Sequence, residues 1–378
     1  MRNIMRLGDV ASYVNGFPFK PSDWSDMGVP IIRIQDLTGN GYQMNRFDGK
    51  YDAKYEVRAG DVLISWSASL GVYVWKLETA VLNQHIFKVR FDKVDVDKDF
   101  FVYQVECLLK KAARQAHGAT MRHLTKPVFD GLPFYLPPKE EQKRIAVQLN
   151  AITHLISLRH RQAEKLDELV EARFVEMFGD PVRNTKHWEK ASLLVLGSCK
   201  NGMSFHANES GIKLRCLGVG DFKNLSYIDD VEQLPFVSLA EKPSANCFLH
   251  DGDIVFVRSN GNKALVGRCL LVYPRDTPTI YSGFCIRYRL LTEKVDPIYA
   301  LHVLKAEGIR QKMSGRGANI QNLNQKILAA IEMPIPPLPL QNAFATFVHE
   351  VDREKERIQR SAALLETLKR SLMQQYFG

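Results

Sequence analysis

The sequence P-P-K-E-E-Q at residues 137–142 opens a long polar stretch that ends with M-F-G at residues 177–179. A second stretch opens with P-P-L-P-L-Q at residues 336–341 and ends with Y-F-G at residues 376–378. The starts and the ends of the two stretches are both 199 positions apart (336 − 137 and 376 − 177). We therefore expect two long helices that are copies of each other in the same register.

Each helix carries a narrow apolar seam with the alternating three- and four-residue spacing of a coiled coil. The predicted seam residues are Ile145, Leu149, Ile152, Ile156, Leu166, Val170, Phe344, Val348, Val351, Ile358, Leu365 and Leu372. The first helix enters the second half of the chain, where the second helix starts, so the two seams can meet only if the helices are antiparallel. The 39 residues from Glu140 to Phe178 would span about 58 Å. Two unrelated surface helices are the alternative.

The blocks before the helices repeat as well, which predicts two α/β (α+β) domains in tandem with an internal pseudo-two-fold repeat. The predicted boundaries are 1–138 and 180–337 for these domains and 139–179 and 338–378 for the spacer helices. L-G-D at residues 7–9 matches L-G-S at 196–198 with an offset of 189. G-D-V-L-I-S from residue 60 matches G-D-I-V-F-V from residue 252 with an offset of 192, and later matches have an offset of 199.

The composition favours an intracellular protein with a polyanionic partner. The net charge is +9, shared between both halves of the chain, and the isoelectric point is about 9.1. The six cysteines form no C-x-x-C pair, which predicts reduced thiols. The start of the chain has no apolar core for a signal peptide, and no stretch approaches a membrane span, so we expect a cytoplasmic protein.

Catalytic and metal-binding motifs are not found in the sequence, which predicts that the chain is not an enzyme. There is no G-x-x-x-x-G-K-[ST] phosphate loop, no H-E-x-x-H metal motif and no N-P-P-[YF] box. Glu141 and Lys143 have the spacing of a nuclease site but lack an aspartate on a preceding strand. Asp61 and Asp253 each follow a glycine before a strand, where turn formation is the simpler explanation.

Polar and basic residues in strands and glycine-containing loops are candidates for DNA contacts, because they can hold phosphates or read base edges. In the first block they are Arg58, Ser65, Trp66, Gln84, His85, Lys88, Arg90, Thr120, Arg122, His123 and Lys126. In the second block they are Arg258, Ser259, Asn260, Asn262, Lys263, Arg268, Arg287, Arg289, Asn319, Gln321 and Asn322. A solvated surface role is the alternative for each, and His85 fits a core position equally well.

The tandem pattern resembles the specificity (S) subunit of type I restriction–modification enzymes. The resemblance lies in the G-D-V-L-I-S and G-D-I-V-F-V strands, L-N-Q-H-I-F-K-V at residues 82–89, the G-A-T-M-R-H-L and G-A-N-I-Q-N-L loops, and the proline–glutamine starts of both helices. It implies that each target recognition domain reads one half of a bipartite, gapped DNA site. The helices would set the gap and dock methyltransferase subunits, two of them in the simplest case.

The same resemblance implies that restriction subunits complete the complex and that S-adenosylmethionine and Mg-ATP belong to partner subunits, not to this chain. Two other hypotheses remain open at this stage. One is a stand-alone structural or inhibitory mimic that binds methyltransferase subunits without directing them to DNA. The other is an enzyme with hidden nuclease activity, which would need metal-dependent cleavage that depends on Glu141.

Overall fold

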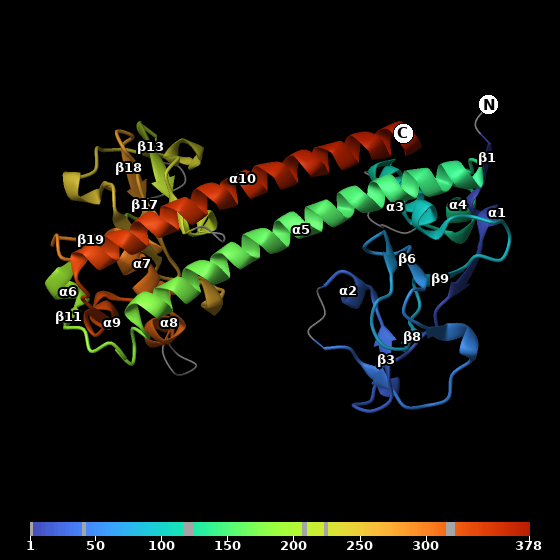
Figure 1. Cartoon of the computed structure of the whole chain (residues 1–378), viewed down its shortest axis with the longest axis horizontal. Coiled ribbons are helices and arrows are strands. Elements are labelled where there is room, and N and C mark those ends of the chain that lie inside the picture. The colour runs from blue at the N-terminus through green and yellow to red at the C-terminus, as the bar shows by residue number, and fades with distance from the viewer. Residues whose placement is uncertain (1–2, 40–42, 116–123, 206–209, 223–225, 315–321) are drawn as a thin grey trace. The chain divides into compact units, whose positions relative to one another are not determined.

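The computed structural model describes residues 3–39, 43–115, 124–205, 210–222, 226–314 and 322–378. The chain divides into unit 1, residues 1–161 with 358–378, and unit 2, residues 162–357. Figure 1 shows the two longest helices, α5 (Lys139–Phe178) and α10 (Leu338–Phe377), each of 40 residues. Each unit therefore contains one globular block, the start of one long helix and the end of the other.

Unit 1 contains two four-stranded sheets and a two-stranded ribbon. The strand orders are β2-β9-β6-β7, with antiparallel neighbours, and β4-β3-β8-β5, in which β3 and β8 are parallel; β1 pairs with β10. The strands are β1 (Ile4–Arg6), β2 (Ser12–Asn15), β3 (Val29–Ile32), β4 (Arg46–Phe47), β5 (Glu56–Val57), β6 (Val62–Ser65), β7 (Gly71–Val74), β8 (Ala80–Leu82), β9 (Ile86–Arg90) and β10 (Pro133–Tyr135). The short helices are α1 (Leu7–Val10), α2 (Ile34–Leu37) and α4 (Lys126–Asp130), and α3 (Lys98–Gln115) packs on the first sheet.

In its described residues, unit 2 has the same plan with one more strand in its first sheet and one fewer in its second. The strand orders are β12-β19-β16-β17-β14 and β15-β13-β18, and β11 pairs with β20. The strands are β11 (Lys190–Ser192), β12 (Gly197–Asn201), β13 (Ile212–Leu217), β14 (Tyr227–Ile228), β15 (Phe236–Leu239), β16 (Asp253–Val257), β17 (Cys269–Val272), β18 (Thr279–Tyr281), β19 (Cys285–Leu290) and β20 (Glu332–Pro334). The helices are α6 (Leu193–Leu196), α7 (Pro297–Lys305), α8 (Glu307–Ser314) and α9 (Gln325–Ala329).

The central strand pairings of the two units share one register, as the sequence offsets predict. Lys88 of β9 lies opposite Leu63 of β6, and Arg287 of β19 lies opposite Val255 of β16. These positions differ by 192 (255 − 63) and 199 (287 − 88). The offset rises between β16 and β18, because the connection from β16 to β17 is longer than the one from β6 to β7.

The predicted match between L-G-D at residues 7–9 and L-G-S at residues 196–198 is wrong. Helix α1 begins at Leu7 and its counterpart α6 begins at Leu193, so the true offset is 186 (193 − 7). The strands that precede these helices agree with this offset. β1 and β11 start 186 positions apart, and they pair with β10 and β20 in the same register. Two shared letters in a short motif are weaker evidence than the hydrogen bonds that place each helix.

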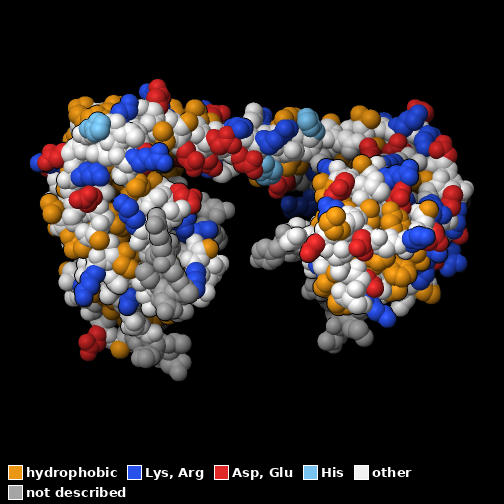
Figure 2. Space-filling model, turned by 90° about the horizontal axis from the view of Figure 1, so that it is seen from below, with side chains coloured by type: hydrophobic (Ala, Val, Ile, Leu, Met, Phe, Trp, Pro, Cys, Tyr) orange, Lys and Arg blue, Asp and Glu red, His pale blue; other side chains and the backbone are white. Residues whose placement is uncertain are grey.

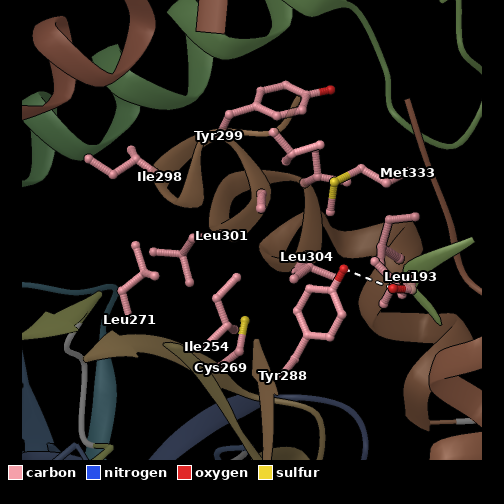
Figure 3. Close-up of a cluster of buried hydrophobic side chains, with 14 of the residues drawn as sticks. Leu193, Ile254, Cys269, Leu271, Tyr288, Ile298, Tyr299, Leu301, Leu304 and Met333 are labelled. Atoms are coloured by element: carbon pink, nitrogen blue, oxygen red, sulfur yellow. Dashed lines mark hydrogen bonds between the residues drawn. The ribbon is translucent and has the colours of Figure 1, made fainter. Parts of the chain in front are cut away.

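A tyrosine hydroxyl holds this short helix in both units, but it comes from different strands. Tyr13 of β2 donates to the backbone oxygen of Leu7 at 2.9 Å. In unit 2 the donor is Tyr288 of β19, which reaches the backbone oxygen of Leu193 at 2.9 Å across the core shown in Figure 3. Because β2 pairs with β9, and β12 with β19, a side chain from either strand can reach the same acceptor.

In unit 1 the start of α5 and the end of α10 pack into the core of the first block. Ile145 and Leu149 of α5 lie in one cluster with Phe100, Phe134 and Phe377, and the rings of Phe100 and Phe377 are 5.5 Å apart. The hydroxyl of Tyr376 also donates to Gln148 at 2.6 Å. The two helix segments therefore run in opposite directions within unit 1.

In unit 2 the roles of the long helices are exchanged. Val170, Phe174 and Phe178 at the end of α5 share a cluster with Phe344 and Val348 at the start of α10. An ion pair between Lys355 and Asp167 joins the same two helix segments on the surface. The segments are again antiparallel, and the ring of Phe178 contacts Tyr299 as that of Phe377 contacts its counterpart in unit 1.

One glutamine at each helix start ties the helix to the block before it. Gln142 is 2 % exposed; its Oε1 accepts from the Asp97 amide at 2.7 Å and its Nε2 donates to the Pro137 oxygen at 2.7 Å. Gln341 is fully buried and makes the equivalent bonds to Asp296 at 2.9 Å and to its own proline at 2.7 Å. The retained glutamine of the P-P-x-x-x-Q motif is thus a structural anchor.

None of the helices formed by the described residues has the length and apolar character needed to cross a membrane.

Candidate nucleic-acid interface

Three short segments and one leucine meet at one edge of the first sheet in each unit, and we call this the loop edge. In unit 1 it comprises residues 15–17, 65–67, 83–86 and Leu124, and in unit 2 residues 201–203, 257–259, 282–285 and Leu323. The Trp66 amide donates to the His85 oxygen at 3.3 Å, and the Leu124 amide donates to the Trp66 oxygen at 3.1 Å. These bonds bring together residues that the sequence separates by up to 58 positions (124 − 66).

The loop edge of unit 1 includes three aromatic residues, Phe17, Trp66 and His85. Trp66 stacks on Phe87 with ring centroids 5.6 Å apart, meets the His85 ring edge-on at 5.0 Å, and donates from its indole nitrogen to Asn15 at 3.3 Å. Lys126 lies over the Phe87 ring at 5.8 Å and pairs with Asp130. Most of the aromatic surface is therefore packed within the unit, with a cation beside it.

Two further predicted contacts of this edge differ in exposure. Ser65 is fully buried, and its hydroxyl donates to the Ser67 backbone oxygen at 3.1 Å. Gln84 is half-buried, and its backbone nitrogen donates to the backbone oxygen of Phe17 at 2.9 Å. Ser65 therefore supports the loop from below, whereas the side chain of Gln84 reaches the surface.

The loop edge of unit 2 carries a longer polar loop between β16 and β17. Asn262 accepts from the Ala264 amide at 3.0 Å, and Asn260 accepts from the Asn262 amide at 2.8 Å, so the loop is held by its own amides. Ser259 forms an isolated bridge with Asn322. Arg258 donates from Nη1 to the Gly283 oxygen at 3.2 Å. Lys263 and Arg268 also lie on this loop, the first exposed and the second half-buried.

The predicted basic strand face has mainly internal partners. Lys88 pairs with Asp61 at 2.8 Å, and Arg289 pairs with the buried Asp253 at 2.7 Å. Arg287 is 5 % exposed. Each aspartate also accepts a hydrogen bond within the turn before its strand. Asp61 accepts from the amide of residue 58 at 2.8 Å, and Asp253 accepts from the amide of residue 250 at 2.7 Å. Strand pairing thus brings a carboxylate beside Lys88 and Arg289 and buries Arg287.

Other predicted contacts lie elsewhere or outside the described residues. Arg58 precedes β6 and pairs with Glu56 at 2.7 Å, and the exposed Arg90 ends β9, so both lie at the strand ends opposite the loop edge. The remaining predicted contacts fall outside the described residues: Thr120, Arg122, His123, Asn319 and Gln321. As DNA contacts, all the residues of the set stay predictions.

The predicted seam residues of the long helices are buried or half-buried. Those that are less than a tenth exposed are Ile145, Leu149, Ile152, Val170, Phe344, Val348, Val351 and Ile358. Ile156, Leu166, Leu365 and Leu372 are half-buried. This pattern supports the seam that the three- and four-residue spacing predicts.

Several groups where α7 and β14 of unit 2 meet α10 have shifted pKa values. Burial, with Lys305 nearby, lowers the pKa of His302 to about 3. Burial also lowers the pKa of Lys305, whose ammonium donates to Ser226 at 2.7 Å. Burial raises the pKa of Asp352, which hydrogen-bonds Tyr227. These groups connect α7, β14 and α10, which suits a structural role. Among the described residues, no cluster of His, Cys, Asp or Glu is placed to hold a metal ion.

The sequence interpretation missed Phe284, the residue of unit 2 that corresponds to His85 (284 − 85 = 199). Its side chain is 62 % exposed and lies at the loop edge, where its backbone oxygen accepts from the Arg258 amide at 2.8 Å. The 199-residue offset was the available signal.

Solved structures of restriction–modification proteins share this fold. The chain is similar to a chain from a study of complex assembly and conformational transition of the type I restriction–modification system, with a TM-score of 0.61, 15 % identity, and coverage of 99 % of this chain and 97 % of that one. It is also similar to the S subunit of a type I system from M. genitalium, with a TM-score of 0.55, 15 % identity and coverage of 100 % and 96 %. The fold is thus that of a type I specificity subunit, with two mixed α/β domains in tandem.

The sequence relationships lead to the same class. A model of the type I restriction modification DNA specificity domain matches residues 3–168 and again residues 192–366. The specificity subunit of MjaVIII from Methanocaldococcus jannaschii is 24 % identical over 390 residues, 95 % of this chain and 89 % of that protein. The specificity subunit of EcoBI from Escherichia coli is 26 % identical over 167 residues, 44 % of this chain and 35 % of that protein.

Because the family match covers most of the chain in two copies, the chain belongs to the type I restriction modification DNA specificity family. It is a specificity subunit, a DNA-recognition component rather than an enzyme.

Proposed function

We propose that each unit reads one half of a bipartite, gapped DNA site through its loop edge. The single observation that carries this is the repeated backbone arrangement of the loop edge with different side chains on it. Bonds equivalent to those of Trp66 join Arg258 to Phe284 at 2.8 Å and Leu323 to Arg258 at 2.8 Å. A constant support with changed side chains presents two reading surfaces of equal geometry and different sequence preference.

The charge distribution suits base reading supported by scattered phosphate contacts. On the face shown in Figure 2, Lys and Arg side chains are interspersed with acidic and apolar ones and form no continuous basic stripe. The net charge of +9 still favours approach to a polyanion. Lys126 in unit 1 and Lys263 in unit 2 are exposed cations beside the loop edges.

The long helices act as the spacer in this proposal. The antiparallel contacts within each unit support one continuous two-helix coiled coil with a pseudo-two-fold relation between the repeats. Forty residues of helix span about 60 Å. At about 3.4 Å per base pair, this length suits two half-sites separated by unread bases. In this proposal the two globular domains end at residues 138 and 337, and the first spacer helix ends at residue 179.

The partners and cofactors extend the proposal beyond this chain. One related structure concerns the assembly of a type I restriction–modification complex. We infer that this chain likewise binds double-stranded DNA and methyltransferase subunits, two of them if the repeat is used twice, with restriction subunits in the full complex. S-adenosylmethionine and Mg-ATP would be held by those partners.

Genome-wide mapping of methylated bases in cells with and without this chain tests the proposal. The expected result is one bipartite motif that is methylated only when the chain is present. Replacing residues 180–335 by the corresponding block of another specificity subunit should change one half of the motif and keep the other. Binding of methyltransferase subunits without any chain-dependent motif would instead indicate a stand-alone inhibitory mimic.

A further inference from the structure

The backbone at the tip of the loop edge is nearly the same in the two units. The Gly16 amide donates to the Ile86 oxygen at 3.1 Å, and the Gly202 amide donates to the Cys285 oxygen at 3.0 Å. A Cβ on Gly16 would lie 2.0 Å from the Asn83 oxygen, and one on Gly202 would lie 2.1 Å from the equivalent oxygen. Glycine is therefore required at this close approach in both units.

Phe284 stands on this fixed support with most of its ring in solvent. Its backbone oxygen accepts from the amides of Arg258 and Ser259 at 2.8 and 3.3 Å, and its own amide donates to the Ser282 hydroxyl at 3.3 Å. Three bonds thus fix the backbone while the side chain stays 62 % exposed. The backbone that carries the ring is therefore held in place, while the ring itself stays accessible to a ligand.

The surroundings of Phe284 are polar and able to hydrogen-bond. The Arg258 guanidinium is held against the loop by the Gly283 oxygen at 3.2 Å, and Ser259 bridges to the exposed Asn322. A single exposed phenylalanine is common on protein surfaces and need not have a function. Here, however, the equivalent position in unit 1 also carries a ring, that of His85 packed against Trp66. An aromatic ring recurs at one position of two otherwise different edges.

We propose that Phe284 is a specificity-determining residue of unit 2, whose ring makes an apolar contact with one base of the half-site, through a thymine methyl group or a base face. His85 occupies the corresponding reading position of unit 1. The inference rests on the proposed function, because it assigns one base contact within the loop edge. The hydrogen-bonding neighbours of Phe284 would read adjacent base edges.

The test uses the full chain with its methyltransferase partner and maps methylated motifs for F284A, H85A and a control. Leu291→Ala is the matched control, because Leu291 is an apolar residue, 71 % exposed, at the opposite end of the same strand. F284A should weaken the preference at one base position of one half-site by about 5- to 150-fold. H85A should change one position in the other half-site, and L291A should leave the motif unchanged.

Other outcomes separate this proposal from the proposed function. A wild-type motif for F284A overturns the role of Phe284, as does a uniform loss of methylation with unchanged base preference. Changes by F284A and H85A in the same half-site overturn the assignment of one ring to each half. If the wild-type chain itself directs no methylation to any motif, the proposed function fails first. The conservative variant F284H distinguishes loss of the ring from loss of its apolar character.

Discussion

Gln341→Ala should destabilise unit 2 far more than an ordinary helix-surface substitution does. The buried amide accepts from the Asp296 nitrogen at 2.9 Å and donates to the oxygens of Lys294 and Pro336 at 3.0 and 2.7 Å. Alanine leaves three buried backbone groups without these partners, at about 1–3 kcal/mol for each group that water cannot reach. Allowing for partial access of water, we expect a loss of about 2–4 kcal/mol in the free energy of unfolding.

The assay is urea denaturation of the full chain combined with hydrogen exchange of the α7 start, where the Asp296 amide loses its acceptor. Gln142→Ala removes two equivalent bonds in unit 1 and should destabilise that unit by a smaller amount. Gln359→Ala, on an exposed position of α10, is the control and should change stability by less than about 0.5 kcal/mol. Gln341→Glu keeps one acceptor but turns a carboxylate oxygen towards two carbonyl oxygens, so it should be no better than alanine.

The reasoning about the anchor would be refuted if Q341A were as stable as Q359A. It would also be refuted if exchange at the start of α7 were unchanged while the global stability fell. The first result would mean that the glutamine bonds contribute nothing beyond those made with water. The second would mean that Gln341 acts through general packing and not through the Asp296 amide.

Two further predictions concern buried charges. Asp253→Ala should destabilise unit 2 by about 3–5 kcal/mol in urea denaturation, because it leaves the guanidinium of Arg289 without its carboxylate. Asp61→Ala should have a smaller effect, because the ion pair of Asp61 with Lys88 is more exposed. Equal effects of the two substitutions would contradict this reasoning. Burial raises the pKa of Asp352, so its ionised form opposes folding above that pKa. Asp352→Asn, which can still accept from Tyr227, should raise the melting temperature at pH 7, with the gain shrinking as the pH falls towards about 4; a gain independent of pH would exclude this cause.

The sequence predicted the elements whose signals are local or repeated. Apolar and basic residues alternate over residues 85–91 with the period of a strand, which agrees with β9, and Pro137 and Gly179 mark the limits of α5 within one or two residues. The 199-residue offset correctly related Lys88 to Arg287, which occupy equivalent positions in the strand pairings of the two units. These signals work because strand alternation, proline before a helix and glycine after it act through the residues themselves.

The features that the sequence did not predict depend on contacts between distant residues. Tyr13 is the donor to the short helix in unit 1, whereas in unit 2 the donor is Tyr288, which lies 95 positions from its acceptor Leu193. The pairing of Arg289 with Asp253 depends on strand register, which brings together residues 36 positions apart. The anchoring role of Gln341 was not visible either, because its partners lie in a loop 45 positions earlier. Burial and hydrogen-bond partners cannot be read from residue type alone.

The most direct test of the central claim is to shorten both long helices and map the methylated motif. Deleting residues 159–165 and 358–364 together removes one heptad from each helix at positions related by the 199-residue offset, which preserves the phase of the seam. The spacer would shorten by about 10 Å, or about three base pairs. The account predicts a motif with both half-sites unchanged and a shorter gap. An unchanged gap would contradict the claim that the two helices set the distance between two reading units.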